Sequence, residues 1–487
     1  MDVYRTFSLC LARLSSQSRP DRSCYGHGTC GHTSWRGIQC VYIDRFGNSY
    51  ACILSLALRG LFVCVGSKTS ACETSSLKRG DMKMIMANKF YYLRGGAERY
   101  LLDVSKRLEA QGHEIIPFAM KDVQNLETPY ERFFVSQVET QRTRFDWQGL
   151  RTFGRMLYSF EAKKKMNALI KEVQPDFCHI HNIYGQISPS ILDALQKNKI
   201  PVVMTVHDHH LVSPAYNVWA QGCGSQDIPR GVVRATFSRF HKDSLVASFA
   251  QVLAFRLHEM MGIYKHKVDL FLCPSVYMRS RLIATGFAAE KIRVLHNPVE
   301  TERILPSYQH RGYFLFVGRL SPEKGGATIL RLARFLPNIH FKIVGSGPEQ
   351  EKLEQKGRGL SNVEFLGFRI GDALQELYHG AIAVLIPSRV QDNFPFTALE
   401  AHASGKPVIG SEVGGMGEIV QDRVTGFLVK PLDLHGWSEA VMRLWYDDDL
   451  QQQMSKAARE WVEKRFTIRA HDEQLMRLYE EVRRKIK

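Results

Sequence analysis

The sequence predicts an α/β protein made of two Rossmann-like domains, each a parallel sheet with helices on both faces. From Lys83 onward, short apolar runs alternate with amphipathic stretches, which is the strand–helix–strand order of a parallel sheet. The polar, irregular stretch 299–311 interrupts this order, and the alternation starts again at Gly312. Such an interruption is typical of a linker between domains. A length of 487 residues fits two to four domains.

The first 81 residues do not share this pattern. They show no sustained helical or strand period, so we expect either a disordered extension or a reading frame that starts upstream of the native start near Met82. Cys24, His27, Cys30 and His32 lie close together there, but their spacing matches no common zinc finger. We therefore expect no metal site.

The domain at 82–298 offers ligand-binding positions where its strands end. Strands are expected at 83–87, 114–118, 177–181, 202–206, 270–273 and 292–295, with helices at 97–111, 158–173 and 188–197. Ligands of parallel sheets bind at the carboxyl ends of the strands. Gly95 and Gly96 follow the first strand, where a plain turn is an equal alternative, and His207 follows the fourth. Alternation puts His179 and His181 on one strand face, and we expect them to pack in the core.

The domain at 312–465 carries the strongest charge pattern. A strand at 313–317 leads into Gly318 and Arg319, and Lys324 follows before the next helix. Held on one loop, a guanidinium and an ammonium group can grip two phosphate oxygens. Asp392 lies in a later polar loop, and we expect Glu400 to open a short helix ending at Ser404. Carboxylates beside a phosphate site suit the hydroxyls of the same ligand.

Charge and composition indicate which classes of binding partner to expect. The formal charge of +16 favours anionic partners, but no helix-turn-helix, zinc-finger or RNP-like pattern is visible, so nucleic acid is not expected. The basic stretches 141–172 and 230–267 can form either a face that rests on an anionic membrane or solvated helix faces over a core stripe. The longest apolar window, 51–66, is too short to span a membrane. Seven of ten cysteines precede Met82, so the main body is poor in cysteine, as in a cytoplasmic protein.

Two motifs carry a resemblance to a known family. The run D-N-F-P-F-T-A-L-E-A at 392–401 resembles the motif E-G-F-G-L-x-x-x-E-A, and G-R-L-x-x-x-K-G at 318–325 is matched without a gap. Both are typical of retaining glycosyltransferases of family 4, the group 1 glycosyl transferases with the GT-B fold. The resemblance covers the chain from about Met82 to the end. Asp392 stands where the family has Glu, and Pro395, which lacks an N–H, where it has Gly.

The resemblance implies the architecture and the reaction. The two domains should face each other across a cleft, with the last helix, 466–487, crossing back to the first domain. The implied reaction moves a sugar, with retention of configuration, from a nucleotide-diphosphate sugar to a hydroxyl of a saccharide or lipid-linked acceptor in polysaccharide or glycolipid assembly. This reaction requires neither a metal ion nor a cofactor. We expect the protein in the cytoplasm or on the inner face of the membrane.

The resemblance also assigns roles. Arg319 and Lys324 would bind the diphosphate, Glu400 the ribose, and Asp392 and His207 the transferred sugar. The residues expected to line the donor site are Gly95, Gly96, Gly318, Gly345, Gly347, Phe368, Phe394, Phe396 and Thr397. Two alternatives remain open: a nucleotide-sugar epimerase of the same fold, and a catalytically weak protein that binds sugar nucleotides.

Overall fold

The computed structural model describes residues 38–43, 49–54, 82–137, 153–185, 187–214, 232–237 and 244–486. The chain divides into two compact units, 1–80 and 81–487. In the first unit, β1 (Ile38–Ile43) and β2 (Ser49–Leu54) pair in antiparallel fashion. These strands were not expected, although their Ile, Val and Tyr residues favour strand structure. Cys24, His27, Cys30 and His32 lie outside the described residues.

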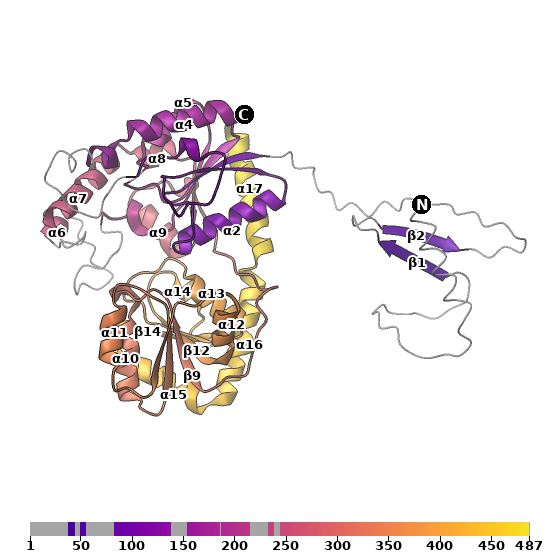
Figure 1. The fold of residues 1–487 in the computed structure, drawn as a ribbon, viewed down its shortest axis with the longest axis vertical. Coiled ribbons are helices and arrows are strands. Elements are labelled where there is room, and N and C mark those ends of the chain that lie inside the picture. Colours follow the sequence, from indigo (N-terminus) through magenta and orange to yellow (C-terminus); the bar gives the residue numbers. More distant parts are fainter. Residues whose placement is uncertain are drawn as a thin grey trace, which may run out of the picture. The chain divides into compact units, whose positions relative to one another are not determined.

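The second unit holds two six-stranded sheets, and every strand pair in them is parallel (Figure 1). The N-terminal sheet has the order β4-β3-β5-β6-β7-β8. Its strands are β3 (Lys83–Ala87), β4 (Glu114–Phe118), β5 (Phe177–Ile180), β6 (Val202–Thr205), β7 (Leu270–Cys273) and β8 (Ile292–Val294). The principal helices around it are α2 (Gly96–Ala110), α4 (Phe160–Val173), α5 (Ser190–Lys197), α7 (Leu245–Met260) and α9 (Val276–Ala284).

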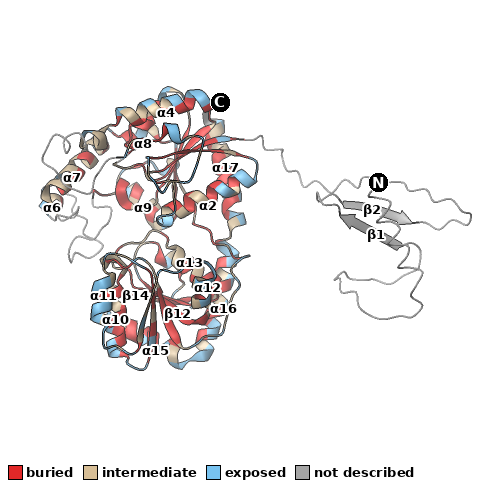
Figure 2. Ribbon diagram, in the orientation of Figure 1, coloured by how far each residue is buried: buried red, intermediate tan, exposed pale blue. Residues whose placement is uncertain are grey.

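The C-terminal sheet has the order β11-β10-β9-β12-β13-β14. Its strands are β9 (Tyr313–Val317), β10 (His340–Val344), β11 (Val363–Gly367), β12 (Ala381–Ile386), β13 (Val408–Ser411) and β14 (Gly426–Val429). All residues of the central strand β12 are buried, as expected for a parallel strand covered on both faces (Figure 2). The covering helices include α10 (Gly326–Phe335), α11 (Gln350–Gly357), α12 (Gly371–Gly380), α13 (Phe396–Ala403), α14 (Met416–Ile419) and α15 (Leu434–Tyr446).

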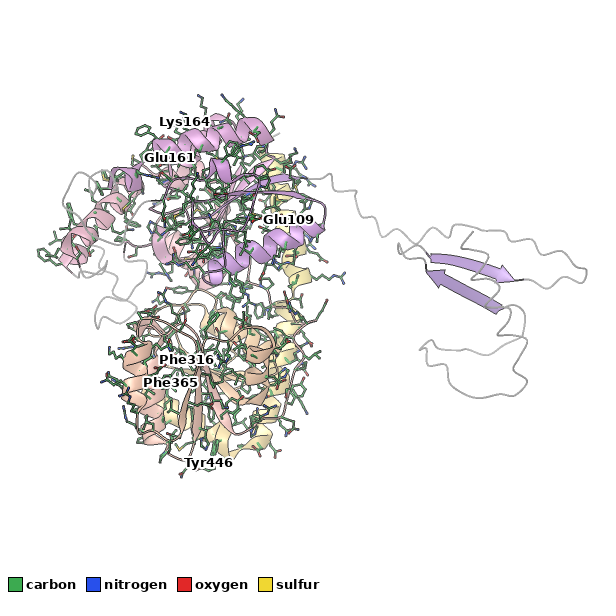
Figure 3. All side chains as sticks on the ribbon, in the orientation of Figure 1. Glu109, Glu161, Lys164, Phe316, Phe365 and Tyr446 are labelled. Atoms are coloured by element: carbon green, nitrogen blue, oxygen red, sulfur yellow. The ribbon has the colours of Figure 1, made fainter. Side chains whose placement is uncertain are left out.

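We call each six-stranded sheet with its covering helices a lobe, and side chains fill the interior of the C-terminal lobe. Figure 3 places Phe316 and Phe365 within it and Tyr446 at its far end, away from the other lobe. Phe316 is buried and Tyr446 is exposed. The predicted α/β class with two parallel sheets is therefore confirmed.

The last helix joins the two lobes. After α16 (Asp448–Arg465), the chain turns at buried Phe466, and α17 (Ile468–Ile486) packs against the N-terminal sheet. Leu475 and Tyr479 of α17 share a buried cluster with Met84 and Phe177. The predicted crossing of the C-terminal helix is confirmed (Figure 1).

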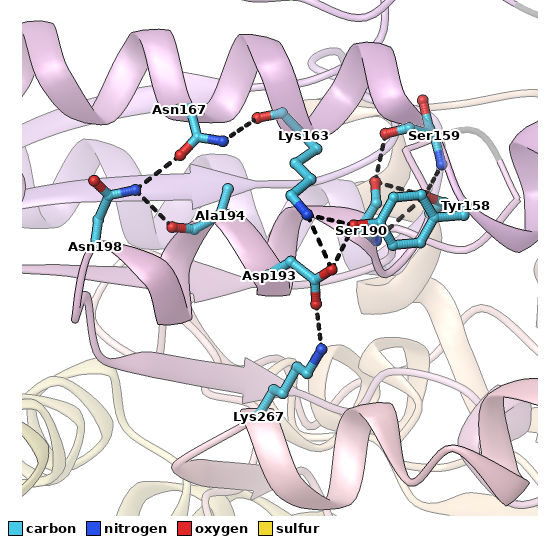
Figure 4. A network of polar contacts seen from close by, with 10 residues as sticks. Tyr158, Ser159, Lys163, Asn167, Ser190, Asp193, Ala194, Asn198 and Lys267 are labelled. Carbon is cyan, nitrogen blue, oxygen red and sulfur yellow. Dashed lines mark hydrogen bonds and ion pairs between the residues drawn. The ribbon is translucent and has the colours of Figure 1, made fainter.

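Several basic side chains of the two basic stretches form partly exposed ion pairs with carboxylates. Lys163 Nζ lies 3.3 Å from one carboxylate oxygen of Asp193, and Lys267 pairs with the other oxygen (Figure 4). Arg155 pairs with Glu161 at 3.1 Å, and Arg256 pairs with Glu259 at 2.6 Å. These ion pairs neutralise part of the positive charge of the two basic stretches. Arg142, Arg144, Arg151, Arg230, Arg239 and Lys242 lie outside the described residues.

Candidate active site between the two lobes

The carboxyl edges of the two sheets meet directly. The side-chain amide of Asn393, in the loop after β12, donates to the backbone oxygen of His207, after β6, over 2.9 Å. The Glu418 carboxylate of α14 accepts the N–H groups of Val276 and Tyr277, at the start of α9, over 2.8 and 2.9 Å. A carboxylate at a helix N-terminus is a favourable electrostatic contact. The segments after β6 and β12 and the helices α9 and α14 therefore meet, and we call the region where the two carboxyl edges face each other the inter-lobe site.

Gly345 and Gly347, two of the residues expected to line the donor site, allow close contact between the loops after β9 and β10. Gly345 has φ 138°, and a Cβ there would lie 1.8 Å from the backbone oxygen of Gly318. A Cβ at Gly347 would lie 2.4 Å from the oxygen of Leu320. Any side chain at these positions would push the two loops apart. The glycines thus fix the position of the Gly318 loop.

Lys324 and Asp392 form an ion pair in this site. Lys324 Nζ lies 2.6 Å from Asp392 Oδ1, and the hydroxyl of Ser388 donates to Asp392 Oδ2 over 2.5 Å. The resemblance assigned these two side chains to different parts of a ligand, the diphosphate and the sugar. The structure brings them together and joins them to each other. Sequence reasoning missed Ser388, which gave no signal of its own.

Gly325 holds the lysine loop in place. It has φ 75°, and a Cβ there would lie 1.9 Å from the backbone oxygen of Pro387, at the end of β12. The lysine loop after β9 therefore presses directly on the strand that leads to Asp392. This backbone contact explains why the two charged side chains meet.

The side chains of Arg319 and Phe368 are exposed to solvent. Both lie at the carboxyl edge of the C-terminal sheet, Arg319 after β9 and Phe368 after β11. Arg319 is exposed and forms no ion pair with any residue in the part of the chain that the structure describes. The Phe368 side chain is 64% exposed. A free guanidinium group and an uncovered aromatic ring at one edge could hold a phosphate and a planar base.

Glu400 contacts the opposite lobe. It is paired with Arg99 of α2, and its other carboxylate oxygen accepts the Tyr378 hydroxyl over 3.0 Å. Arg99 also lies over the ring of Phe396, 5.3 Å from its centroid. Glu400 does not open its helix as expected: α13 begins at Phe396, one turn earlier. Sequence reasoning missed Arg99 and Tyr378, although Arg99 comes three residues after Gly96.

The remaining aromatic and glycine positions lie along the same seam. α2 begins at Gly96 with Gly95 as its N-cap, and no described side chain caps it. A Cβ on Gly96 would lie 3.5 Å from the Phe396 ring, an ordinary contact. Phe396 and Thr397 form the first turn of α13 and are half-buried. Gly96 and Phe396 therefore lie next to each other where the two lobes meet.

Phe394 is turned away from solvent. Its side chain is buried and stacks on His296, with ring centroids 4.8 Å apart. Its backbone oxygen accepts from the side chain of Asn297 over 3.0 Å. The contacts of Phe394 therefore go to the protein, and they join the two lobes.

His207 belongs to a group of neutral imidazoles. Its Nε2 lies 2.8 Å from Nδ1 of His181, and burial lowers the pKa of His207 to about 3. His179 and His181 are fully buried, as expected, and His179 contacts the hydroxyls of Tyr479 and Thr205 at 2.7 Å each. Burial disfavours the charged form of all three rings.

The side chains after His207 serve the local fold. Asp208 accepts the backbone N–H of His210 over 2.9 Å, and burial raises the pKa of Asp208 to about 6. Among the described residues, no three His, Cys, Asp or Glu side chains gather as metal ligands do. None of the described helices combines the length and the apolar character needed to cross a membrane.

Comparison with known families agrees with this geometry. The model of "Glycosyl transferases group 1" matches residues 300–461, and that of "Glycosyltransferase Family 4" matches residues 94–303. The sulfoquinovosyl transferase of Arabidopsis thaliana is 27% identical over 61% of this chain and 54% of its own length. The D-inositol 3-phosphate glycosyltransferase of Corynebacterium glutamicum is 27% identical over 79% of this chain and 91% of its own.

Solved structures show the same fold. HepE of Anabaena, solved in complex with UDP, has a TM-score of 0.60 at 17% identity, over 82% of this chain and 100% of that one. The sucrose-phosphate synthase of Thermosynechococcus elongatus also has a TM-score of 0.60, at 18% identity, over 82% of this chain and 98% of that one. With both family models matched in sequence order across the two lobes, the chain belongs to the group 1 glycosyltransferases and is a transferase enzyme of the GT-B fold.

Proposed function

We propose that the protein moves a sugar, with retention of anomeric configuration, from a nucleotide-diphosphate sugar to a hydroxyl acceptor. The observation that carries the proposal is the gathering of charge where the lobes meet. Lys324, Asp392 and Glu400 lie on loops and a helix at the carboxyl edge of the C-terminal sheet, which contacts His207 of the other lobe. Cations for a diphosphate and carboxylates for sugar hydroxyls are the groups that such a donor requires.

A uridine nucleotide is the first donor to test. The HepE structures were solved with UDP and with UDP-glucose, and their fold covers 82% of this chain. Here the exposed ring of Phe368 is available to a base. The ribose would lie at Glu400, and its hydroxyls would have to share the carboxylate with Arg99 and Tyr378.

Arg319 and Lys324 would stabilise the departing diphosphate. Negative charge develops on the leaving oxygen as the bond from the anomeric carbon breaks, and fixed cations lower the energy of that state. Lys324 can act without leaving Asp392, because an ammonium group has three donors. The Asp392 carboxylate keeps free lone pairs for a sugar hydroxyl. The first-turn N–H groups of α13, with Phe396 and Thr397, add positive potential.

The acceptor oxygen would attack from the side on which the diphosphate leaves. A double-displacement route needs a free carboxylate beside the anomeric carbon. The ion pair of Asp392 with Lys324 and that of Glu400 with Arg99 lower the nucleophilicity of both carboxylates, so neither is an obvious nucleophile. In the proposed step, the bond from carbon to phosphate oxygen breaks, the bond to the acceptor oxygen forms, and the acceptor proton passes to the leaving phosphate. Because the two cations neutralise the diphosphate, we propose that turnover persists in EDTA.

For the acceptor, we propose a saccharide or a lipid-linked saccharide, and a role in polysaccharide or glycolipid assembly. For a contact with an anionic membrane, we propose α7 and its C-terminal end. Phe249, Met260 and Met261 are exposed there. Co-sedimentation with vesicles containing anionic lipid tests the contact: Phe249→Ser with Met260→Ser should reduce binding, whereas undiminished binding would rule out this surface.

Incubation with UDP-, GDP- and ADP-sugars and a panel of acceptors tests the proposed reaction. We expect one donor to give a glycoside whose anomeric configuration, read by NMR, matches that of the donor. Arg319→Ala should abolish transfer, whereas Arg303→Ala, at an exposed arginine beside Glu300, should not. An inverted product would contradict the mechanism. An isomerised sugar nucleotide formed without acceptor would indicate an epimerase, and tight binding without turnover would indicate a binding protein.

A further inference from the structure

A pair of histidines lies at the carboxyl ends of β5 and β6. His181 Nδ1 and His207 Nε2 are 2.8 Å apart, and the two rings lie edge to edge and nearly coplanar, with centroids 5.1 Å apart and an interplanar angle of 20°. His181 is completely buried, whereas His207 is partly accessible. His181 therefore lies behind His207, on the side away from solvent.

One hydrogen must lie between these two nitrogens. Burial lowers the pKa of both imidazoles, so both are neutral and each carries a single N–H. The contact at 2.8 Å then requires one ring to donate and the other to accept.

The second nitrogen of His181 decides which ring donates. His181 Nε2 is buried and has no hydrogen-bond partner. If His207 donated, His181 would carry its hydrogen on this nitrogen, as a buried N–H without an acceptor. Orphaned buried N–H groups are rarer than under-used acceptors. The favoured arrangement puts the hydrogen on His181 Nδ1, which donates to His207 Nε2.

We propose that His181 is a positioning residue that fixes His207 in the tautomer with its hydrogen on Nδ1, so that His207 donates to an oxygen of the transferred sugar. The identity of that ligand rests on the proposed function. In the described part of the chain, no residue forms a hydrogen bond with His207 Nδ1, and this atom is not fully buried. It is therefore available to a ligand in the inter-lobe site.

The surroundings hold both rings. His179 lies 4.3 Å from His181 between ring centroids, and the hydroxyls of Tyr479 and Thr205 fix His179. The ring of Tyr100 meets His207 edge-on at 5.3 Å. Tyr479 comes from α17, so the helix that crosses back to the first lobe supports the histidine pair.

The test is the tautomer of His207, read from two-bond ¹H–¹⁵N correlations in protein labelled at histidine nitrogens. The spectrum of the unliganded wild-type protein should show the hydrogen of His207 on Nδ1, with assignment by His207→Gln. A hydrogen on Nε2 would overturn the proposal. This measurement needs neither donor nor turnover, so its failure is separate from failure of the proposed reaction.

Variants add a kinetic test. His181→Phe keeps an aromatic ring but removes the donor, so His207 should shift toward the other tautomer and kcat should fall about tenfold with little change in the KM for donor. His181→Gln, whose amide can donate, should recover part of kcat. His113→Phe, at a buried histidine that contacts the backbone of Met82, should leave the His207 spectrum unchanged. An unchanged tautomer and kcat in a folded His181→Phe variant would also refute the role.

Discussion

The Lys324–Asp392 pair allows a structural role to be separated from a catalytic one. We consider Lys324→Met, which keeps the aliphatic stem and removes the charge. The Lys324 side chain is 32% exposed and the Asp392 side chain 15%. Because the pair is partly solvated, its loss should lower the free energy of unfolding by only about 1 kcal/mol. A melting temperature lower by only about 1 °C is expected for a unit of this size.

The catalytic effect should be much larger. If Lys324 stabilises the departing diphosphate, its removal should lower kcat by a factor of about 10² to 10³, or about 2.7–4 kcal/mol in the activation barrier. Lys342→Met is a matched control, because its ammonium group lies 3.1 Å from Glu364 and its side chain is 28% exposed in the same lobe. That variant should keep wild-type turnover.

The assay is steady-state transfer at saturating donor, with thermal denaturation in parallel. A second variant, Lys324→Met with Asp392→Asn, removes both charges. If the pair were only structural, the double variant would regain turnover; we expect it to recover stability and remain inactive. Turnover above a third of the wild-type value in folded Lys324→Met would refute a role on the leaving group.

Three further predictions concern the same lobe and its contact with α2. Arg99→Ala frees the Glu400 carboxylate, so UDP should bind about two- to fivefold more tightly by calorimetry. The control Arg132→Ala, which breaks the more exposed ion pair with Glu172, should leave UDP affinity unchanged. Weaker UDP binding by Arg99→Ala would show that Arg99 positions Glu400 instead. Gly325→Ala should lower the free energy of unfolding by more than about 2 kcal/mol in chemical denaturation, because its Cβ would meet Pro387. The control Gly312→Ala, at φ 76° with open space around it, should lower it by about 1 kcal/mol. Equal losses of stability would contradict the contact. Lys406 is buried, its ammonium group donates to the backbone oxygen of Gln309 over 2.7 Å, and burial lowers its pKa to about 7. Between pH 7 and about 10 the unfolded chain holds a proton that the folded protein lacks, so wild-type stability rises with pH there. The stabilising effect of Lys406→Met should therefore be largest at pH 7 and below, and should shrink above pH 7 by about 1.4 kcal/mol per pH unit. The exposed control Lys352→Met should show no such dependence. A pH-independent difference would show that Lys406 is not titrating.

Features set by local order were predictable from sequence. Alternating strands and helices imply parallel sheets, and parallel sheets bring the segments after each strand to one edge. Local order alone therefore predicts that Arg319, Lys324 and Asp392 lie at one edge of the sheet. The helix that holds Glu400 begins one turn before its predicted start, because Phe396 and Thr397 are weak helix formers and the packing of α13 holds them in the first turn.

Contacts between distant segments were not predictable. Arg99 and Glu400 are 301 positions apart, and no local pattern pairs them. The same holds for His179 and Tyr479, which meet only because α17 returns to the first lobe. The pairing of Lys324 with Asp392 is set by the packing of the Gly325 loop against the backbone oxygen of Pro387. No sequence motif marks that contact.

The central claim is that the cations after β9 bind the diphosphate of a sugar donor at the inter-lobe site. Calorimetric titration with UDP-, GDP- and ADP-sugars, on the wild-type protein and on the double variant Arg319→Ala with Lys324→Met, measures this directly. We expect one donor to bind the wild-type protein with one-to-one stoichiometry, and the double variant to bind it at least tenfold more weakly. Equal affinity in both proteins, or no binding of any donor to the wild type, would contradict the claim.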